Sequence, residues 1–180
     1  MRIIAGQWRG RVLVAPKGDT TRPTADRTRE ALFSMLTSRL GSFEGLRVAD
    51  LFAGSGALGL EALSRGAAAC TFVEQDRQAL DALRANLAAL KAVGDVRAQS
   101  VMTLAPVREG FDLILMDPPY GTGAGQVALD RCRRLGWVAD GAIISIETAR
   151  DERVELARFT VEAERVHGKA KITLLRPAFQ

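Results

Sequence analysis

Between residues 46 and 147, short apolar segments alternate with segments of helical periodicity. The apolar run at 111–116 is typical of a strand that is buried on both faces of a sheet. In the segment 77–90, leucines recur at the three- and four-residue spacing of one helix face. This alternation predicts an α/β fold, with a mostly parallel sheet and helices on both sides. We expect strands at 46–52, 69–74, 96–99, 111–116 and 142–147, helices at 58–65, 77–90 and 125–135, and a terminal antiparallel hairpin at 159–166 and 171–175.

The first 29 residues differ from the rest of the chain in charge. They carry seven basic and two acidic side chains, whereas the whole chain has a formal net charge of +4. Apolar residues flanking a glycine-containing turn predict a β-hairpin over 2–15, and a helix is predicted over 25–40. We divide the chain into a basic N-terminal β-hairpin or arm, residues 1–21, and an α/β domain, residues 22–180. Positive charge of this kind suits a phosphate backbone, although a solvated surface strand pair is the alternative.

The composition excludes several classes of protein. The 180 residues are 47% hydrophobic and 26% charged, which fits one ordinary globular domain. Because no apolar run approaches the roughly 20 residues that span a membrane, and no signal core is present, we expect a cytoplasmic protein without membrane contact. The two cysteines, Cys70 and Cys132, match no metal-ligand spacing, and His167 is the single histidine. We therefore expect no metal site and no Ser-His-Asp triad.

A G-x-G-x-x-G turn begins at Gly54, after a predicted strand and before a predicted helix. Glycines let the backbone turn sharply and approach a ligand closely. Glu74 lies 20 residues beyond Gly54, at the end of the next predicted strand, where a carboxylate can accept hydrogen bonds from ribose hydroxyls. These features satisfy the dinucleotide fingerprint, so NAD is one alternative.

Two features favour a nucleoside with an amino-acid tail over a dinucleotide. After the first nucleotide-binding half, only about 100 residues remain, too few for a second half and a substrate domain. Asp50 also stands four residues before Gly54, at the strand end. A carboxylate there suits an ammonium group and would repel a pyrophosphate.

The sequence Asp117-Pro118-Pro119-Tyr120 follows the central predicted strand. Two consecutive prolines fix φ and remove two backbone donors, so the Asp117 and Pro118 carbonyls can face a ligand. The turn brings a carboxylate, a carbonyl and an aromatic ring to the carboxyl ends of the strands, where ligands bind in such sheets. A rigid turn without a ligand is the alternative.

A turn of this kind, in a chain with an Asp-x-x-x-Gly-x-Gly turn, resembles the amino-methyltransferases, which methylate exocyclic amines of bases. Over essentially its whole length the chain resembles the bacterial RsmD family, whose motifs occur here in order as Arg2–Arg11, Arg22–Glu30, Asp50–Gly66 and Asp117–Tyr120. Members methylate the N2 amine of a guanine, guanine 966, in 16S rRNA of the small ribosomal subunit. The resemblance implies a Rossmann-like class I fold that uses S-adenosylmethionine.

The resemblance also implies roles for individual residues. Asp117 and Pro118 would accept the N–H hydrogens of the target amine, so that its lone pair points at the methyl group, and Tyr120 would stack on the base. Ser100 stands where many relatives have Asp or Asn, and a hydroxyl brings no charge to the adenine amine. The residues expected to hold the cofactor are Asp50, Phe52, Gly54, Gly56, Glu74, Gln75, Ser100 and Val101.

The basic N-terminal segment is expected to hold RNA. Arg22, Arg27 and Arg29 lie near a helix start, where the helix dipole disfavours cations, which suggests phosphate or substrate contact. Trp8 lies among basic residues and could stack on a base or pack under the hairpin. The residues expected to contact RNA are Trp8, Arg9, Arg11, Arg22, Arg27 and Arg29.

Several alternatives to a guanine-N2 methyltransferase of 16S rRNA remain. A DNA adenine-N6 methyltransferase shares the Asp-Pro-Pro-Tyr turn, but no residues remain here for a large target-recognition domain. A protein-glutamine methyltransferase typically has Asn where Asp117 stands. A non-catalytic RNA-binding assembly factor on the same fold is the alternative from a different class. We expect a monomer whose partner is the small ribosomal subunit.

Overall fold

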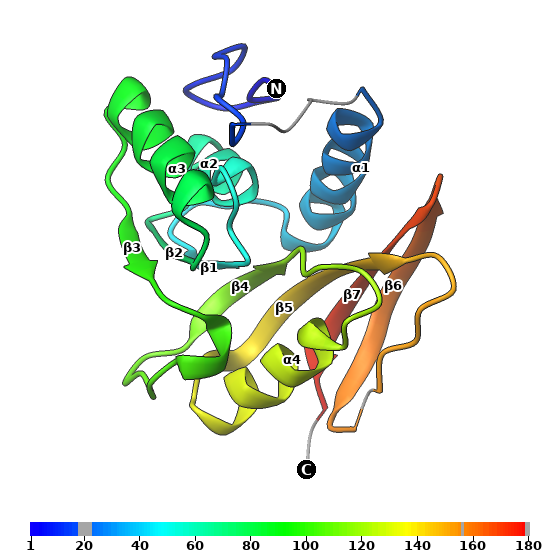
Figure 1. Cartoon of the computed structure of the whole chain (residues 1–180). Coiled ribbons are helices and arrows are strands. Elements are labelled where there is room, and N and C mark those ends of the chain that lie inside the picture. The colour runs from blue at the N-terminus through cyan, green and yellow to red at the C-terminus, as the bar shows by residue number, and fades with distance from the viewer. Residues whose placement is uncertain (18–22, 156, 179–180) are drawn as a thin grey trace.

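The computed structural model describes residues 1–17, 23–155 and 157–178, and it contains one seven-stranded sheet in the order β3-β2-β1-β4-β5-β7-β6 (Figure 1). The strands β1 to β5 pair in parallel, and β7 pairs antiparallel with both β5 and β6. This arrangement confirms the predicted parallel sheet with a terminal antiparallel hairpin. The strand bounds are β1 Arg47–Leu51, β2 Ala69–Glu74, β3 Asp95–Ala98, β4 Phe111–Met116, β5 Val138–Ala149, β6 Phe159–His167 and β7 Ala170–Pro177.

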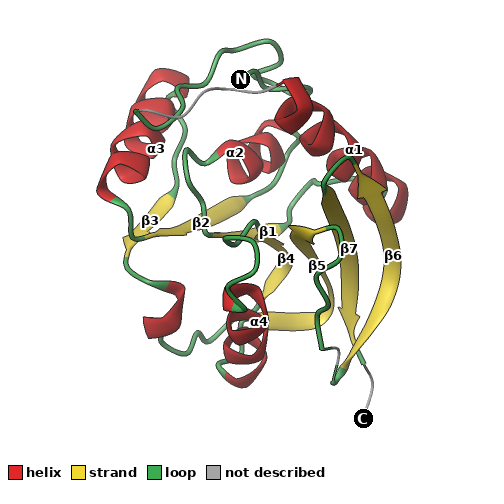
Figure 2. Cartoon of the chain, turned by 45° about the vertical axis from the view of Figure 1, so that its right-hand side comes forward, coloured by secondary structure: helices red, strands yellow, loops and turns green. Residues whose placement is uncertain are grey.

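Helices cover both faces of the sheet (Figures 1 and 2). Three of them, α1, α2 and α3, lie on one side, and α4 lies on the other. The bounds are α1 Pro23–Leu40, α2 Ala57–Ser64, α3 Arg77–Leu90 and α4 Ala124–Arg134, with a short 3₁₀ helix, η1, at Val101–Thr103. The bounds of β2, α3 and β4 coincide with the predicted ones, whereas β5 extends beyond 142–147 at both ends.

The hydrophobic core is divided by the sheet into two clusters. Because side chains alternate along a strand, Leu113 and Leu115 of β4 join the cluster under α1 to α3, and Ile114 and Met116 join the cluster under α4. All four are almost fully buried. Burial on both faces explains why this strand has a continuous apolar sequence instead of an alternating one.

The N-terminal segment differs from the predicted regular hairpin. The described residues pair through one isolated antiparallel bridge, Arg2 with Val12, and residues 2–15 form no named strand. The Ile4 and Ala5 N–H groups donate instead to the two carboxylate oxygens of Glu61 on α2, at 2.8 and 3.1 Å. The two arms still exchange backbone hydrogen bonds, from the Ile3 N–H to the Arg11 carbonyl at 3.0 Å and from the Leu13 N–H to the Met1 carbonyl at 2.8 Å.

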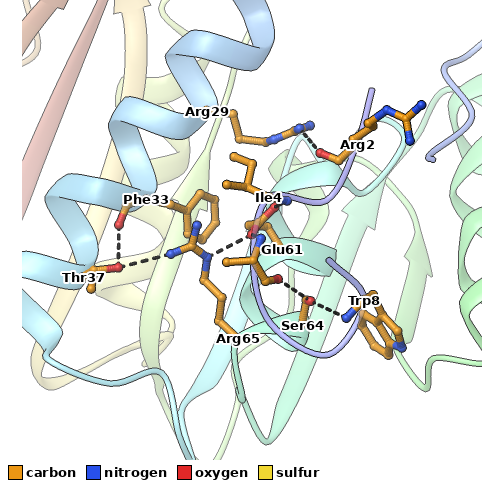
Figure 3. Close-up of polar contacts among 10 residues, drawn as sticks. Arg2, Ile4, Trp8, Arg29, Phe33, Thr37, Glu61, Ser64 and Arg65 are labelled. Carbon is orange, nitrogen blue, oxygen red and sulfur yellow. Dashed lines mark hydrogen bonds and ion pairs between the residues drawn. The ribbon is translucent and has the colours of Figure 1, made fainter. Parts of the chain in front are cut away.

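Buried polar side chains on α2 hold this segment in place (Figure 3). Ser64 donates to the Ala5 carbonyl at 2.6 Å and accepts from the Trp8 N–H at 3.0 Å. Glu61 is fully buried, and its charge is paired with Arg65 at 2.9 Å. The segment up to residue 17 is therefore fixed against the α/β domain, and the predicted boundary at residues 21 and 22 lies outside the described residues.

Candidate active site

The glycine turn connects β1 to α2 in a conformation that needs positive φ angles. Gly54 has φ +59° and Gly56 has φ +84°, and Phe52 also has φ +59° although it is not glycine. A Cβ on Gly56 would lie 2.4 Å from Leu83 Cδ1, whereas a Cβ on Gly54 would meet nothing within 4 Å. Gly56 is thus required for packing, and Gly54 leaves an open space beside the turn. The strained Phe52 lies at this open side, as strained residues at functional sites often do.

Glu74 joins the end of β2 to the glycine turn. One carboxylate oxygen accepts from the Gly54 N–H at 2.7 Å, and the other accepts from the Gln75 and Asp76 N–H groups at 2.8 Å. The side chain lines a small cavity with Phe52 and Gln75. Each carboxylate oxygen can accept more than one hydrogen bond, so the carboxylate can hold the turn and still receive ribose hydroxyls.

Asp50 requires a correction, because we expected it to meet the ligand directly. Its side chain is 1% exposed, lies outside the lining of both described cavities, and accepts from the Gly59 N–H in α2 at 2.9 Å. Burial raises its pKa well above the usual value, and the nearby Asp117 and Glu74 carboxylates contribute to the rise. Asp50 braces the glycine turn from behind, and its position in sequence could not reveal this orientation.

Ser100 requires a second correction. Its hydroxyl accepts from the Met102 N–H at 3.1 Å and caps η1, and the residue is absent from the cavity lining. The neighbouring Gln99 and the predicted Val101 do line the small cavity. Sequence reasoning missed Gln99 because η1, which turns the chain after β3, was not predicted.

The Asp117 turn leaves the sheet at the end of β4. Pro118 is buried, while the Asp117 side chain is open to the adjoining cavity and the Tyr120 ring is 45% exposed. The Tyr120 hydroxyl donates to Glu147 Oε2 on β5 at 2.6 Å. Sequence reasoning missed Glu147, although its place at the end of a predicted strand was a usable signal once the strand order is known.

The carboxyl groups of Asp117 and Glu147 line the same cavity from neighbouring strand ends. Burial raises the pKa of Asp117 to about 8, and the neighbouring Glu147 carboxyl group adds to the rise. Burial and the neighbouring Glu147 carboxyl group also raise the pKa of Tyr120 above its usual value. Asp117 and Glu147 together therefore hold a proton more readily than two isolated carboxyl groups would.

A cavity of about 750 Å³ connects the glycine turn to the Asp117 turn. It brings together Phe52, Gly54, Asp117, Tyr120 and Glu147. The remaining walls are formed by parts of the N-terminal segment, α1, the start of α2 and the turn between β6 and β7. A drug-sized ligand fits a cavity of this volume, and a base beside a nucleoside is of similar size.

Two walls of the cavity, α1 and the end of β6, hold polar side chains whose proximity the sequence did not predict. Thr28 Oγ1 on α1 and His167 Nδ1 at the end of β6 lie 3.1 Å apart. Arg29 also lines the cavity, but it is 6% exposed and donates to the Arg2 carbonyl, and burial lowers its pKa. Arg29 is thus a buried wall residue of the cavity, and its predicted contact with phosphate or substrate stays a prediction.

The other described residues that were predicted to contact RNA are absent from the cavity lining. Arg9, Arg11 and Arg27 are exposed, and the Arg11 guanidinium donates to the Ala89 carbonyl at 2.9 Å. Trp8 is partly buried and packs against the core cluster under α1 to α3, which matches the packing alternative. Arg22 lies outside the described residues.

The described part of the chain offers no group of three or more His, Cys, Asp or Glu side chains that could hold a metal ion. Among the same residues, no helix is both long enough and apolar enough to cross a membrane.

The sheet order, the antiparallel β7 and the position of the glycine turn define the class I fold of S-adenosylmethionine-dependent methyltransferases. A magnesium protoporphyrin IX methyltransferase from Synechocystis, solved with bound S-adenosylmethionine, shares this fold with a TM-score of 0.67 and 14% sequence identity, covering 88% of this chain and 86% of that one.

Comparison with known proteins identifies the family. The family model for conserved hypothetical protein 95 matches residues 1–176. The ribosomal RNA small subunit methyltransferase D of Escherichia coli is 39% identical over 179 residues, covering 97% of this chain and 88% of that protein. A solved Escherichia coli methyltransferase has a TM-score of 0.86 and 39% identity, with 100% of this chain and 99% of that chain covered. The chain therefore belongs to this family, the RsmD family.

Proposed function

We propose that this chain transfers a methyl group from S-adenosylmethionine to the exocyclic N2 amine of a guanine in 16S rRNA. The observation that carries the proposal is the continuous cavity between the Gly54 turn and Asp117. One end has the features of a nucleoside site, and the other holds hydrogen-bond acceptors next to an accessible aromatic ring. The similarity to a small subunit rRNA methyltransferase supports the choice of 16S rRNA and, with it, action in the bacterial cytoplasm.

The residues at the glycine turn fit S-adenosylmethionine. The open space beside Gly54 lets the backbone approach the ligand, and Glu74 has acceptor capacity left for the ribose. Gln75 and Val101 line the small cavity and would border the adenine, and the buried Asp50 accepts a hydrogen bond from the Gly59 N–H behind the turn. When bound, the cofactor supplies a methyl group on a positively charged sulfur.

Asp117 and Pro118 are proposed to prepare the amine for attack. The lone pair of an exocyclic amine is delocalised into the base, which makes the nitrogen a poor nucleophile. Hydrogen bonds from its two N–H groups to the Asp117 carboxylate and the Pro118 carbonyl favour a pyramidal nitrogen with its lone pair free. Nitrogen then bonds to the methyl carbon as the carbon–sulfur bond breaks, and the amine loses one proton. The raised pKa of Asp117 allows its carboxylate to receive that proton.

Tyr120 and the N-terminal segment are proposed to hold the RNA. The Tyr120 ring is accessible at the cavity and can stack on a base that has left its helix. Outside the cavity, Arg9, Arg11 and Arg27 are exposed and can contact phosphates. In this proposal residues 1–21 guide the RNA, and the α/β domain performs the chemistry as a monomer.

The test offers S-adenosylmethionine with a labelled methyl group to naked 16S rRNA, small ribosomal subunits and duplex DNA. The products are then digested to nucleosides and separated. We expect label in N2-methylguanosine from RNA or subunits and none from DNA. Label in N6-methyladenine, label in DNA, or no transfer with any substrate while RNA still binds would each contradict the proposal, the last in favour of an assembly factor.

A further inference from the structure

Glu147 lies beside Asp117 at the edge of the sheet. In the parallel pairing of β4 with β5, Met116 is opposite Ile146, so the next residues along the two strands are Asp117 and Glu147. Both side chains line the 750 Å³ cavity. The two strands thus place two carboxyl groups side by side, facing the space proposed for the base.

Tyr120 fixes the orientation of Glu147. Its hydroxyl donates to Oε2 at 2.6 Å, which leaves Oε1 and further acceptor capacity on Oε2. The described residues also place Thr28, Arg29 and His167 around the same cavity, but on α1 and β6. Asp117 and Glu147 come from neighbouring strand ends and Tyr120 from the turn after β4, and when both carboxyl groups are ionised they offer two adjacent acceptors beside one aromatic ring.

Two adjacent acceptors match one base edge well. Guanine presents its N2 amine and its N1–H next to each other, so both groups donate. In adenine, and in 2-aminopurine, the ring nitrogen N1 has a lone pair in place of the hydrogen and would face a carboxylate with like polarity. A site that is built to accept a hydrogen bond strongly rejects an analogue that lacks the donor.

We propose that Glu147 accepts the guanine N1–H while Asp117 accepts the N2 amine, so that Glu147 selects guanine. This proposal rests on the proposed function, because it assumes that a guanine occupies the cavity. In this proposal Glu147 determines which base is accepted, whereas Asp117 and Pro118 activate the amine. It also explains why Tyr120 both stacks and donates: its ring holds the base plane, and its hydroxyl holds the carboxylate that reads the base edge.

The experiment uses small subunits rebuilt with 16S rRNA that carries either guanosine or 2-aminopurine riboside at the methylated nucleotide. 2-Aminopurine keeps the N2 amine but lacks N1–H. For the wild-type enzyme we expect kcat/KM for guanosine to exceed that for 2-aminopurine by roughly 100-fold. A wild-type ratio near one would overturn the proposal without any substituted protein. Absence of methyl transfer to guanosine would instead overturn the proposed function itself.

The decisive variant is Glu147→Gln, whose amide can donate to the lone pair of N1. We expect its guanosine to 2-aminopurine ratio to fall at least 10-fold below the wild-type ratio. Glu152→Gln is the matched control, because Glu152 accepts from the Gly121 N–H at 3.0 Å and does not line the cavity. Its ratio should equal that of the wild type.

Tyr120→Phe separates base selection from simple positioning of the tyrosine. It removes the hydroxyl that Glu147 accepts and keeps the ring. If Glu147 only positions Tyr120, both variants lose activity equally on the two substrates and the ratio stays at the wild-type value in Glu147→Gln. That result would overturn the proposal, whereas a change in ratio that is larger in Glu147→Gln than in Tyr120→Phe supports it.

Discussion

The two ends of the cavity are constructed differently. The cofactor end comes mainly from one continuous segment, the turn from Asp50 to Gly59, braced by Glu74 on the neighbouring strand. The rest of the cavity is lined by separate segments: the N-terminal segment, α1, the Asp117 turn, β5 and the turn between β6 and β7. The first end is held by its own backbone hydrogen bonds, and the second depends on how the whole sheet folds. We infer that the two ends can be damaged separately, one losing cofactor affinity and the other losing turnover.

The largest effect should come from Asp117→Asn at the base end. The amide keeps the size of the side chain but loses the charge and one acceptor, so kcat should fall at least 100-fold. Cofactor affinity, measured by calorimetry, should stay within about threefold of the wild type, because the glycine turn is unchanged. Asp130→Asn on α4 serves as the control. Retained turnover in Asp117→Asn would contradict the proposed role.

Substitutions of Gly54 and Gly56 test the cofactor end, because one residue borders the open space and the other is required for packing. Gly54→Ala places a Cβ in the open space beside the turn, so we expect affinity for S-adenosylmethionine to fall at least 10-fold, with a stability loss of about 1–2 kcal/mol from the positive φ. Gly56→Ala meets the buried Leu83 as well and should lose about 2–4 kcal/mol. Titration of the cofactor and denaturant unfolding measure the two quantities. Equal effects of both substitutions on stability would show that the space beside Gly54 is not open.

Outside both ends, Arg9 and Arg11 of the N-terminal segment should affect RNA binding and leave cofactor affinity unchanged. Removing two exposed charges in Arg9→Gln/Arg11→Gln should weaken RNA binding about 10-fold and reduce the slope of log K against log salt by roughly one to two. Arg134→Gln on α4, on the other face of the sheet, is the control (Figure 1). If the double variant binds RNA with an unchanged salt dependence, the segment does not contact the backbone.

The last effect concerns the melting temperature and its pH dependence, and it follows from the raised pKa of Asp117. Because the folded state raises this pKa from its ordinary value near 4 to about 8, ionisation of the carboxyl group opposes folding. Its unfavourable contribution is absent below pH 4, grows as the pH rises, and is complete above about pH 8. Asp117→Asn should therefore melt at a higher temperature than the wild type at pH 8, with the difference vanishing near pH 4. An equal difference at both pH values would mean that the carboxyl titrates normally.

The difference between the cofactor end and the base end also explains which parts of the site could be predicted from the sequence. The cofactor end was predictable because Gly54 and Glu74 have a characteristic spacing, and the fold followed from the alternation of apolar and helical segments. The orientation of a side chain was not, so Asp50 was expected at the ligand and Ser100 was expected to be free for adenine. Glu147 and His167 were missed because their neighbours in the cavity are far away in sequence, and only the strand order brings them to Asp117 and α1.

The central claim is that the base occupies the cavity with its exocyclic amine at Asp117. The most direct test is a crystal structure of the protein with S-adenosylhomocysteine and an RNA fragment that contains the methylated guanosine. We predict that N2 lies about 2.6–3.2 Å from the Asp117 carboxylate and the Pro118 carbonyl, with the Tyr120 ring stacked on the base. A guanine bound outside the cavity, or one that presents another edge to Asp117, would contradict the account.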